Sequence, residues 1–164
     1  MTHPDRKYGF TLVEMLVVIA IIGIIVALGF PAFDRQIKTA RLQEAQSQLS
    51  KLVERARSWS RRYSYDFRVD LNQTTQRVSV YPVDNSNIPI ASPPQSLTET
   101  LVNGVKILTI DLPTGVTVIK YNAPFGRNNI ANPIGIILGF DANSLKANVD
   151  IIGVTGMVVN RAIQ

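Results

Sequence analysis

The residues whose types and spacing point to chemistry lie near the start of the chain, at Gly9, Phe10 and Glu14. Gly9 has no side chain, so a protease can approach its backbone closely, and cleavage after it would expose a cationic amine on Phe10. If the new chain end is helical, Phe10 and Glu14 lie four residues apart on one helix face. The amine of one chain could then neutralise the Glu14 carboxylate of a neighbouring chain. The pattern therefore predicts a cleavage site followed by a charge-pairing site.

Glu14 stands directly before a segment, residues 15–30, that carries no charge. Eleven residues of that segment are Leu, Ile, Val or Phe; at roughly 0.3 to 0.6 kcal/mol each they favour membrane insertion by about 3 to 7 kcal/mol. A charge at the helix centre costs roughly 2.5 to 3.5 kcal/mol, and less near the end. Two interpretations of Glu14 stay open: an intramembrane acid that pairs with a positive charge on another chain, or an interfacial acid favoured by the helix dipole.

The remaining residue types argue against an enzyme or a metal site. The chain has no cysteine, and its single histidine, His3, precedes Gly9. After cleavage the chain would lack the commonest general base and the usual metal ligands. The acids of the C-terminal part are scattered, with no pair at a recognisable catalytic spacing. These acids are Asp66, Asp70, Asp84, Asp111, Asp141 and Asp150. We expect no catalytic residue, no cofactor and no metal.

One long helix is expected to position Phe10 and Glu14. Its first part, residues 10–33, is apolar all round and suits a transmembrane or polymerisation helix. Pro31 removes a backbone donor and should bend the helix there. The second part, residues 34–63, is amphipathic, with apolar residues at spacings of three and four. That stripe comprises Leu42, Ala45, Leu49, Leu52, Val53, Ala56, Trp59 and Tyr63. We expect this stripe to pack against a globular head formed by residues 64–164. Residues 1–9, before the helix, form a polar leader.

The head has the pattern of an antiparallel β-sheet. From residue 65 the period changes to two and β-branched residues become frequent. We expect turns at 72–75 and 113–115, and longer loops over 84–103 and 122–133. The predicted strands are Asp66–Leu71, Arg77–Val83, Val105–Leu112, Val116–Tyr121, Gly135–Phe140, Ala147–Ile152 and Met157–Ile163. A sheet packed on the amphipathic half of the helix gives an α+β fold.

The positive charge of the chain is concentrated on the second part of the helix. Residues 35–62 carry eight Lys or Arg against two Glu, whereas from residue 63 onward seven basic residues balance seven acidic ones. These cations suggest either solvated or lipid-facing residues, which we favour, or a stripe that contacts DNA phosphates. The residues concerned are Arg55, Arg57, Arg61, Arg62, Arg68, Arg127 and, near the chain end, Arg161.

The N-terminal sequence Gly9-Phe-Thr-Leu-Val-Glu14, followed by the apolar segment and Pro31, resembles the start of type IV pilins and type II secretion pseudopilins. The resemblance covers about a sixth of the chain. It implies that a prepilin peptidase cuts between Gly9 and Phe10 and methylates the Phe10 amine. It also implies that Glu14 acts in subunit assembly, with the leader in the cytoplasm, one pass through the inner membrane and the head in the periplasm.

The C-terminal part is similar to H-type minor pseudopilins and FimT-like minor pilins, through Pro124–Gly126, the Ile-rich strand 134–140 and Val154–Val158. Gly156 itself is best explained by a turn with positive φ. The resemblance implies a structural minor subunit of a type IV pilus or a secretion pseudopilus, whose partners are the peptidase, other subunits and membrane lipid. The alternative is a minor pilin that binds DNA during uptake. Some FimT-like proteins bind DNA through an Arg-rich C-terminal segment, whereas here residues 157–164 hold one cation, Arg161.

Overall fold

The computed structural model describes residues 10–102, 104–112, 118–128, 130–141, 144–153 and 155–164, without the side chains of 28, 29, 31 and 32. The chain divides into two compact units, Met1–Ile37 and Lys38–Gln164. Helix α1, Leu12–Tyr63, begins in the first unit and ends in the second, as predicted, and is continuous through Pro31. The division falls a few residues after the predicted end of the apolar helix.

The first unit consists of the apolar part of α1. Every described side chain from Phe10 to Ile37 is exposed, although most of them are Ile, Leu, Val, Met or Phe. Within the described residues, no helix combines the length and the apolar character needed to cross a membrane. The membrane span over residues 10–33 stays a prediction.

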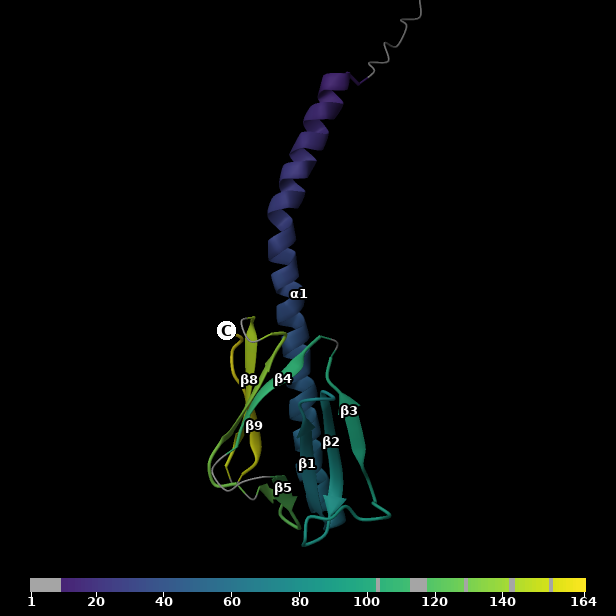
Figure 1. The fold of residues 1–164 in the computed structure, drawn as a ribbon, viewed down its shortest axis with the longest axis vertical. Coiled ribbons are helices and arrows are strands. Elements are labelled where there is room, and N and C mark those ends of the chain that lie inside the picture. The colour runs from purple at the N-terminus through teal and green to yellow at the C-terminus, as the bar shows by residue number, and fades with distance from the viewer. Residues whose placement is uncertain (1–9, 103, 113–117, 129, 142–143, 154) are drawn as a thin grey trace, which may run out of the picture. The chain divides into compact units, whose positions relative to one another are not determined.

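The second unit contains two antiparallel sheets that pack on the rest of α1 (Figure 1). The first has the order β3-β2-β1-β5-β6 and the second the order β4-β7-β8-β9. The strands of the first sheet are β1 Asp66–Asn72, β2 Arg77–Val83, β3 Leu97–Thr100, β5 Ile119–Asn122 and β6 Arg127–Asn128. Those of the second are β4 Lys106–Asp111, β7 Ile134–Gly139, β8 Lys146–Ile152 and β9 Met157–Asn160. The α+β class is confirmed, but the predicted single sheet is two.

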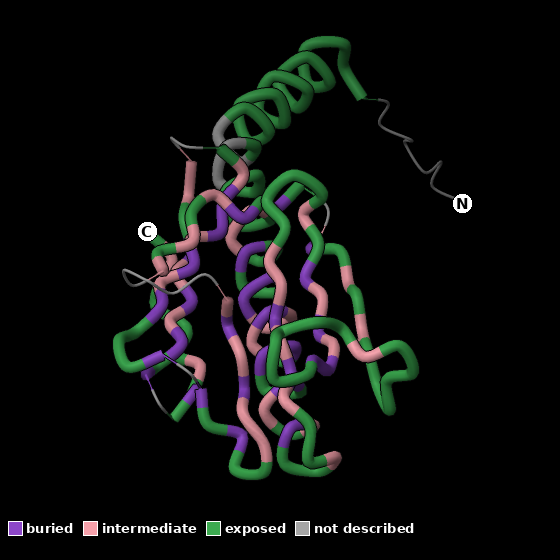
Figure 2. The backbone as a smooth tube through the Cα atoms, turned by 60° about the horizontal axis from the view of Figure 1, so that its bottom comes forward, coloured by how far each residue is buried: buried purple, intermediate pink, exposed green. Residues whose placement is uncertain are grey.

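The core of the second unit lies between α1 and the inner faces of both sheets (Figure 2). Six residues of the predicted stripe are completely or almost completely buried, and Trp59 and Tyr63 pack against them half-buried. In β2, β7 and β8 buried residues alternate with more exposed ones, as expected where one face of a sheet covers a helix. The helical period therefore predicted the seat of the head correctly.

Three details of the predicted sheet were wrong. The loop predicted over 84–103 contains strand β3, and the loop over 122–133 contains β6. The last strand ends at Asn160 and not at Ile163, although Gln164 still exchanges backbone hydrogen bonds with Lys146. The turn after Asn72 is confirmed, because its Oδ1 accepts the N–H groups of Thr74 and Thr75. The predicted turn at 113–115 lies outside the described residues.

Candidate assembly site

The N-terminus of α1 is capped by Thr11. Its hydroxyl oxygen accepts the Glu14 N–H at 3.2 Å, and its carbonyl accepts the Met15 N–H at 3.3 Å. Thr11-Leu-Val-Glu14 has the spacing of a capping box, in which a Thr at the cap and a Glu three residues later satisfy free helix N–H groups. The sequence contained this signal, and our sequence analysis missed it. Thr11 therefore caps the helix by accepting the Glu14 N–H, and the pairing of the Glu14 carboxylate with another chain stays a prediction.

Phe10 and Glu14 are both exposed, with 78% of Phe10 accessible, so a second chain can reach the two groups. Gly9 lies outside the described residues, as does the side chain of Pro31. The cleavage between Gly9 and Phe10, the methylation of Phe10, and the roles of Glu14 and Pro31 in assembly accordingly stay predictions.

A row of polar side chains fixes the second part of α1 to the head. The amide Nε2 of Gln46, a buried residue, donates to the carbonyls of Asn148 and Arg161, each at 3.0 Å. Ser50 donates to Asn160 Oδ1 at 2.9 Å, or to the Gln46 carbonyl one turn back. Sequence reasoning missed this clamp. It holds the end of the chain against the helix.

Tyr121 joins α1, the first sheet and the turn between β8 and β9. Its carbonyl accepts the Ser60 hydroxyl at 3.0 Å, and its own hydroxyl donates to the Gly156 carbonyl at 3.1 Å. Burial raises the pKa of the Tyr121 hydroxyl, because the phenolate would be desolvated. Gly156 has φ +61°, as predicted for its turn, and a Cβ there would lie 2.3 Å from Tyr121 Cε1. Both the positive φ and the close approach of the Tyr121 ring therefore require glycine at this position.

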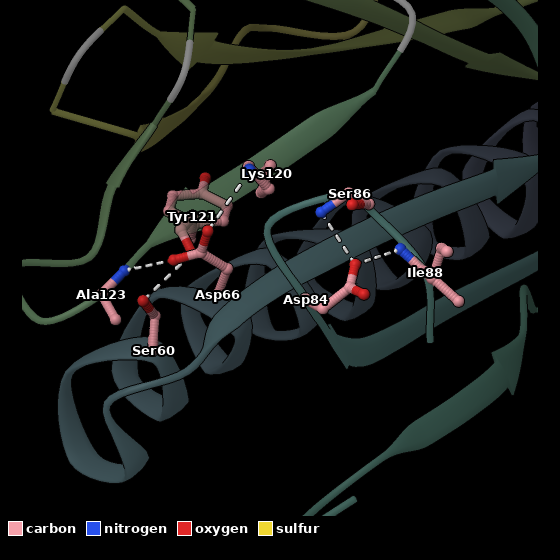
Figure 3. A network of polar contacts seen from close by, with 8 residues as sticks. All are labelled: Ser60, Asp66, Asp84, Ser86, Ile88, Lys120, Tyr121 and Ala123. Carbon is pink, nitrogen blue, oxygen red and sulfur yellow. Dashed lines mark hydrogen bonds and ion pairs between the residues drawn. The ribbon is translucent and has the colours of Figure 1, made fainter. Parts of the chain in front are cut away.

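The acids that the sequence left without a function stabilise loops and strands. Asp66 accepts the Ala123 N–H at 2.8 Å and pairs with Lys120 Nζ at 3.2 Å (Figure 3). Asp84 accepts the N–H groups of Ser86 and Ile88 at 2.9 and 2.8 Å in a loop closure of its own (Figure 3). Among the described residues, no group of three or more His, Cys, Asp or Glu could hold a metal ion.

Asp70 has the same kind of role on the exposed face of the first sheet. It accepts a hydrogen bond from Arg68 Nε at 2.7 Å and another from the Tyr81 hydroxyl. Burial, with the hydrogen bond and the charge of Asp70, raises the pKa of Tyr81 to about 12. This cross-strand group links β1 to β2, and nothing in it suggests catalysis.

The arginines of α1 lie on two flanks of the helix. At 100° per residue, Arg55 and Arg62 fall on one side of the buried stripe, and Arg57 and Arg61 on the other. Arg55 reaches Glu99 at 3.5 Å, while Arg57 and Arg61 lie against Gly126. Arg161 pairs with Asp150. These four arginines therefore do not form one stripe, and no described contact of theirs favours DNA binding.

The N-terminal region of the chain is similar to known proteins. Residues 4–30 match the family described as the prokaryotic N-terminal methylation motif. The chain is 51% identical over 41 residues to a fimbrial protein of Moraxella nonliquefaciens, covering 25% of this chain and 27% of that protein. It is 35% identical over 99 residues to the type IV major pilin protein PilE1 of Neisseria gonorrhoeae, covering 60% and 47%. The chain thus spans less than half the length of these two relatives.

The fold is similar to that of two solved minor subunits. The minor pseudopilin EpsH from the type 2 secretion system of Vibrio cholerae superposes with a TM-score of 0.55 and 11% identity over 74% of this chain and 97% of EpsH. The type IV minor pilin FimU of Pseudomonas aeruginosa gives a TM-score of 0.55 and 14% identity, over 74% and 88%. At such low identity these likenesses show a shared fold: an N-terminal helix packed on antiparallel sheets.

Proposed function

We propose that this chain is a member of the type IV pilin and pseudopilin family, and that it is a structural minor subunit of a type IV pilus or a type II secretion pseudopilus. The observation that carries the proposal is the surface of α1 in the first unit. From Phe10 to Ala27 every side chain is exposed and the one charge is Glu14. A continuous apolar surface of this kind must be covered by lipid or by other chains.

Processing would come before assembly. A prepilin peptidase would hydrolyse the peptide bond between Gly9 and Phe10 with water. It would then transfer a methyl group from a sulfonium methyl donor to the new amine, which gives up a proton. The capped helix start at Thr11 lies just beyond that bond. Cleavage would therefore remove residues 1–9 and leave the helix with its cap intact.

The Phe10 amine and the Glu14 carboxylate would then fix the position of one subunit against the next. Both groups are exposed: Glu14 lies in the first turn of α1, and Phe10 lies just before the helix begins at Leu12. Glu14 is the only charged side chain between Phe10 and Asp34. In an apolar bundle an unpaired carboxylate is costly, whereas an amine of a neighbouring chain neutralises it. Methylation keeps the positive charge of the amine, so pairing stays favourable.

Before assembly the subunit would be held in the inner membrane by residues 10–33, with the head in the periplasm. The cations that follow in the sequence, Arg35, Lys38 and Arg41, suit the level of lipid headgroups. Residues 34–63 would carry the amphipathic half of the helix, and residues 64–164 the head. We infer no DNA-binding role, because no contact of the described arginines favours one.

The test is to express the full chain with a prepilin peptidase and the other filament subunits, and to compare Glu14→Gln with Glu14→Asp. Gln removes the charge, but it is accepted three residues after the cap of a capping box. Asp keeps the charge. We expect incorporation into filaments to fall strongly with Gln and to be largely retained with Asp. Equal incorporation of both variants would contradict charge pairing.

Cleavage is tested separately by the intact mass of the purified chain. We expect a chain that begins at Phe10 and carries one added methyl group, and an uncleaved chain when Gly9→Leu is introduced. An unprocessed wild-type chain in the presence of active peptidase would contradict the proposed function itself.

A further inference from the structure

Among the described residues, no strand pairs with the outer edge of the first sheet, at strand β3. The strand order places β3 at the end of the sheet, and Figure 1 shows it outermost, beside β2. The Leu101 N–H donates to the Gln76 carbonyl at 3.1 Å, so Leu101 and Gln76 form a hydrogen-bonded pair. The next pair along β3 is Thr100 with Arg77. Hydrogen-bonded pairs alternate in an antiparallel ladder. Thr98 and Thr100 therefore direct their N–H and C=O groups away from β2, toward the open edge.

The side chain of Gln48, on α1, substitutes in part for a missing strand. Its Nε2 donates to the Thr100 carbonyl at 3.0 Å and to Glu99 Oε2 at 3.1 Å, so both amide hydrogens are used. Its Oε1 is buried and has no hydrogen-bond partner among the described residues. Leaving such a group unpaired is unfavourable. The edge thus has one carbonyl satisfied by a side chain, and beside it an acceptor that lacks a donor.

A groove of about 400 Å³ runs between this edge and α1. Its lining includes Glu44 and Glu99 as well as Lys51 and Arg55, so the two signs of charge balance. Arg55 and Glu99 moreover lie 3.5 Å apart. A strongly charged ligand would gain little in such a groove. A neutral ligand with alternating donors and acceptors fits it, and a polypeptide backbone is such a ligand.

We propose that this groove binds an extended segment of a neighbouring subunit, which adds to β3 as a further strand of the first sheet. The segment would pair with the outward groups of Thr98 and Thr100. Backbone pairing at an exposed edge is a common way of binding an extended peptide. This inference rests on the proposed function, because the neighbouring subunit is present in a filament.

Hydrogen exchange of the full chain tests the proposal without knowledge of the segment. The amides of Thr98 and Thr100 are compared in the detergent-solubilised subunit and in assembled filaments. We expect both amides to exchange quickly in the subunit and about a hundredfold more slowly in the filament. The amide of Glu99, which the same alternation directs toward β2, is the internal reference and should be slow in both. Fast exchange at Thr98 in the filament would overturn the proposal.

A pair of variants then separates the backbone from the side chain. Thr98→Pro removes the outward N–H but no hydrogen bond to β2, and proline is tolerated at such edge positions. Thr98→Ala keeps the N–H, and both variants lose the contact of the Thr98 hydroxyl with Ser79. We expect Pro to lower filament incorporation at least about tenfold relative to Ala, through the lost edge hydrogen bond. If Thr98→Pro and Thr98→Ala are incorporated equally, and the Thr100 amide exchanges at the same rate in filaments of both variants, edge pairing is contradicted.

The two hypotheses fail in different ways. If Glu14→Gln blocks incorporation while Thr98→Pro and Thr98→Ala behave alike, the subunit function stands and the edge does not bind a neighbour. If the chain is never processed or incorporated, the proposed function fails first. Should Thr98→Pro prevent folding of the head, hydrogen exchange of the wild-type chain still decides.

Discussion

The two parts of α1 differ in what covers their apolar side chains. In the second unit Leu42, Leu49 and Ala56 are completely buried against the sheets. In the first unit Ile24 and Ile25 are 61% and 64% exposed, and the described residues of that unit contain no strand that could cover them. The same local structure therefore serves two purposes. One half builds the core of the head, and in the other half the described apolar side chains are exposed.

The difference teaches that the apolar content of a segment does not by itself say where the segment packs. Residues 15–27 are more apolar than residues 42–56, yet the less apolar half is the buried one. Its apolar residues form one stripe, which a sheet can cover, whereas those of the first half surround the helix. A helix that is apolar on all sides needs an environment that is apolar on all sides.

The largest expected effect comes from Leu49→Ala, compared with Leu16→Ala. Leu49 is 0% exposed and Leu16 is 56% exposed. Truncation of a buried leucine costs about 2 to 5 kcal/mol of unfolding free energy, because a cavity is left in the core. We expect that loss for Leu49→Ala, and a change within about 0.5 kcal/mol for Leu16→Ala. Denaturant unfolding of the detergent-solubilised chain, followed by fluorescence of the single Trp, would measure both. Equal losses would mean that the first half is also packed.

Two glycines sharpen the same comparison. A Cβ at Gly156 would meet the Tyr121 ring at 2.3 Å, on a backbone with φ +61°, whereas a Cβ at Gly23 would meet nothing within 4 Å. We expect Gly156→Ala to lower the unfolding free energy of the head by about 2 to 4 kcal/mol, from left-handed strain and overpacking. Gly23→Ala should leave head stability unchanged. A stable Gly156→Ala head would show that Tyr121 can move aside.

The sequence predicted those features that depend on local period. The stripe from Leu42 to Tyr63 and most strands of the head follow from spacings of three to four and of two. The N-terminal motif likewise lies within a few consecutive residues. Strand β3 was missed because it has four residues and follows a proline-containing segment, so its alternation is too short to detect.

What could not be predicted joins residues far apart in the chain. The contact of Gln46 with Asn148 spans 102 residues, and that of Tyr121 with Gly156 spans 35. The division into two sheets also depends on which strands pair, and alternation alone does not specify partners. The sites predicted for cleavage and assembly need groups of other chains and stay predictions.

The polar clamp gives an intermediate effect. Gln46→Ala removes two hydrogen bonds and leaves the carbonyls of Asn148 and Arg161 without that donor. We expect a loss of about 1 to 3 kcal/mol in unfolding free energy. The exposed Gln43, three residues earlier on α1, provides the matched control, and Gln43→Ala should change stability by less than about 0.5 kcal/mol. If both variants behave alike, the clamp does not contribute to holding the chain end on the helix.

The smallest effect concerns alkaline pH and is confined to the second unit, because residues 10–37 contain no tyrosine. In the folded head the pKa of Tyr81 is raised from 10.0 to about 12, chiefly by burial and by Asp70. Below pH 10 the hydroxyl is protonated in both the folded and the unfolded chain, so stability is unaffected. Between pH 10 and about 12 the unfolded chain loses this proton first, and stability falls. Tyr121, whose pKa is also raised by burial, adds to the same fall.

Tyr81→Phe should therefore flatten part of the decline in unfolding free energy over that range, measured by denaturant titration at several pH values. An unchanged slope would mean that the Tyr81 hydroxyl has the same pKa in both states.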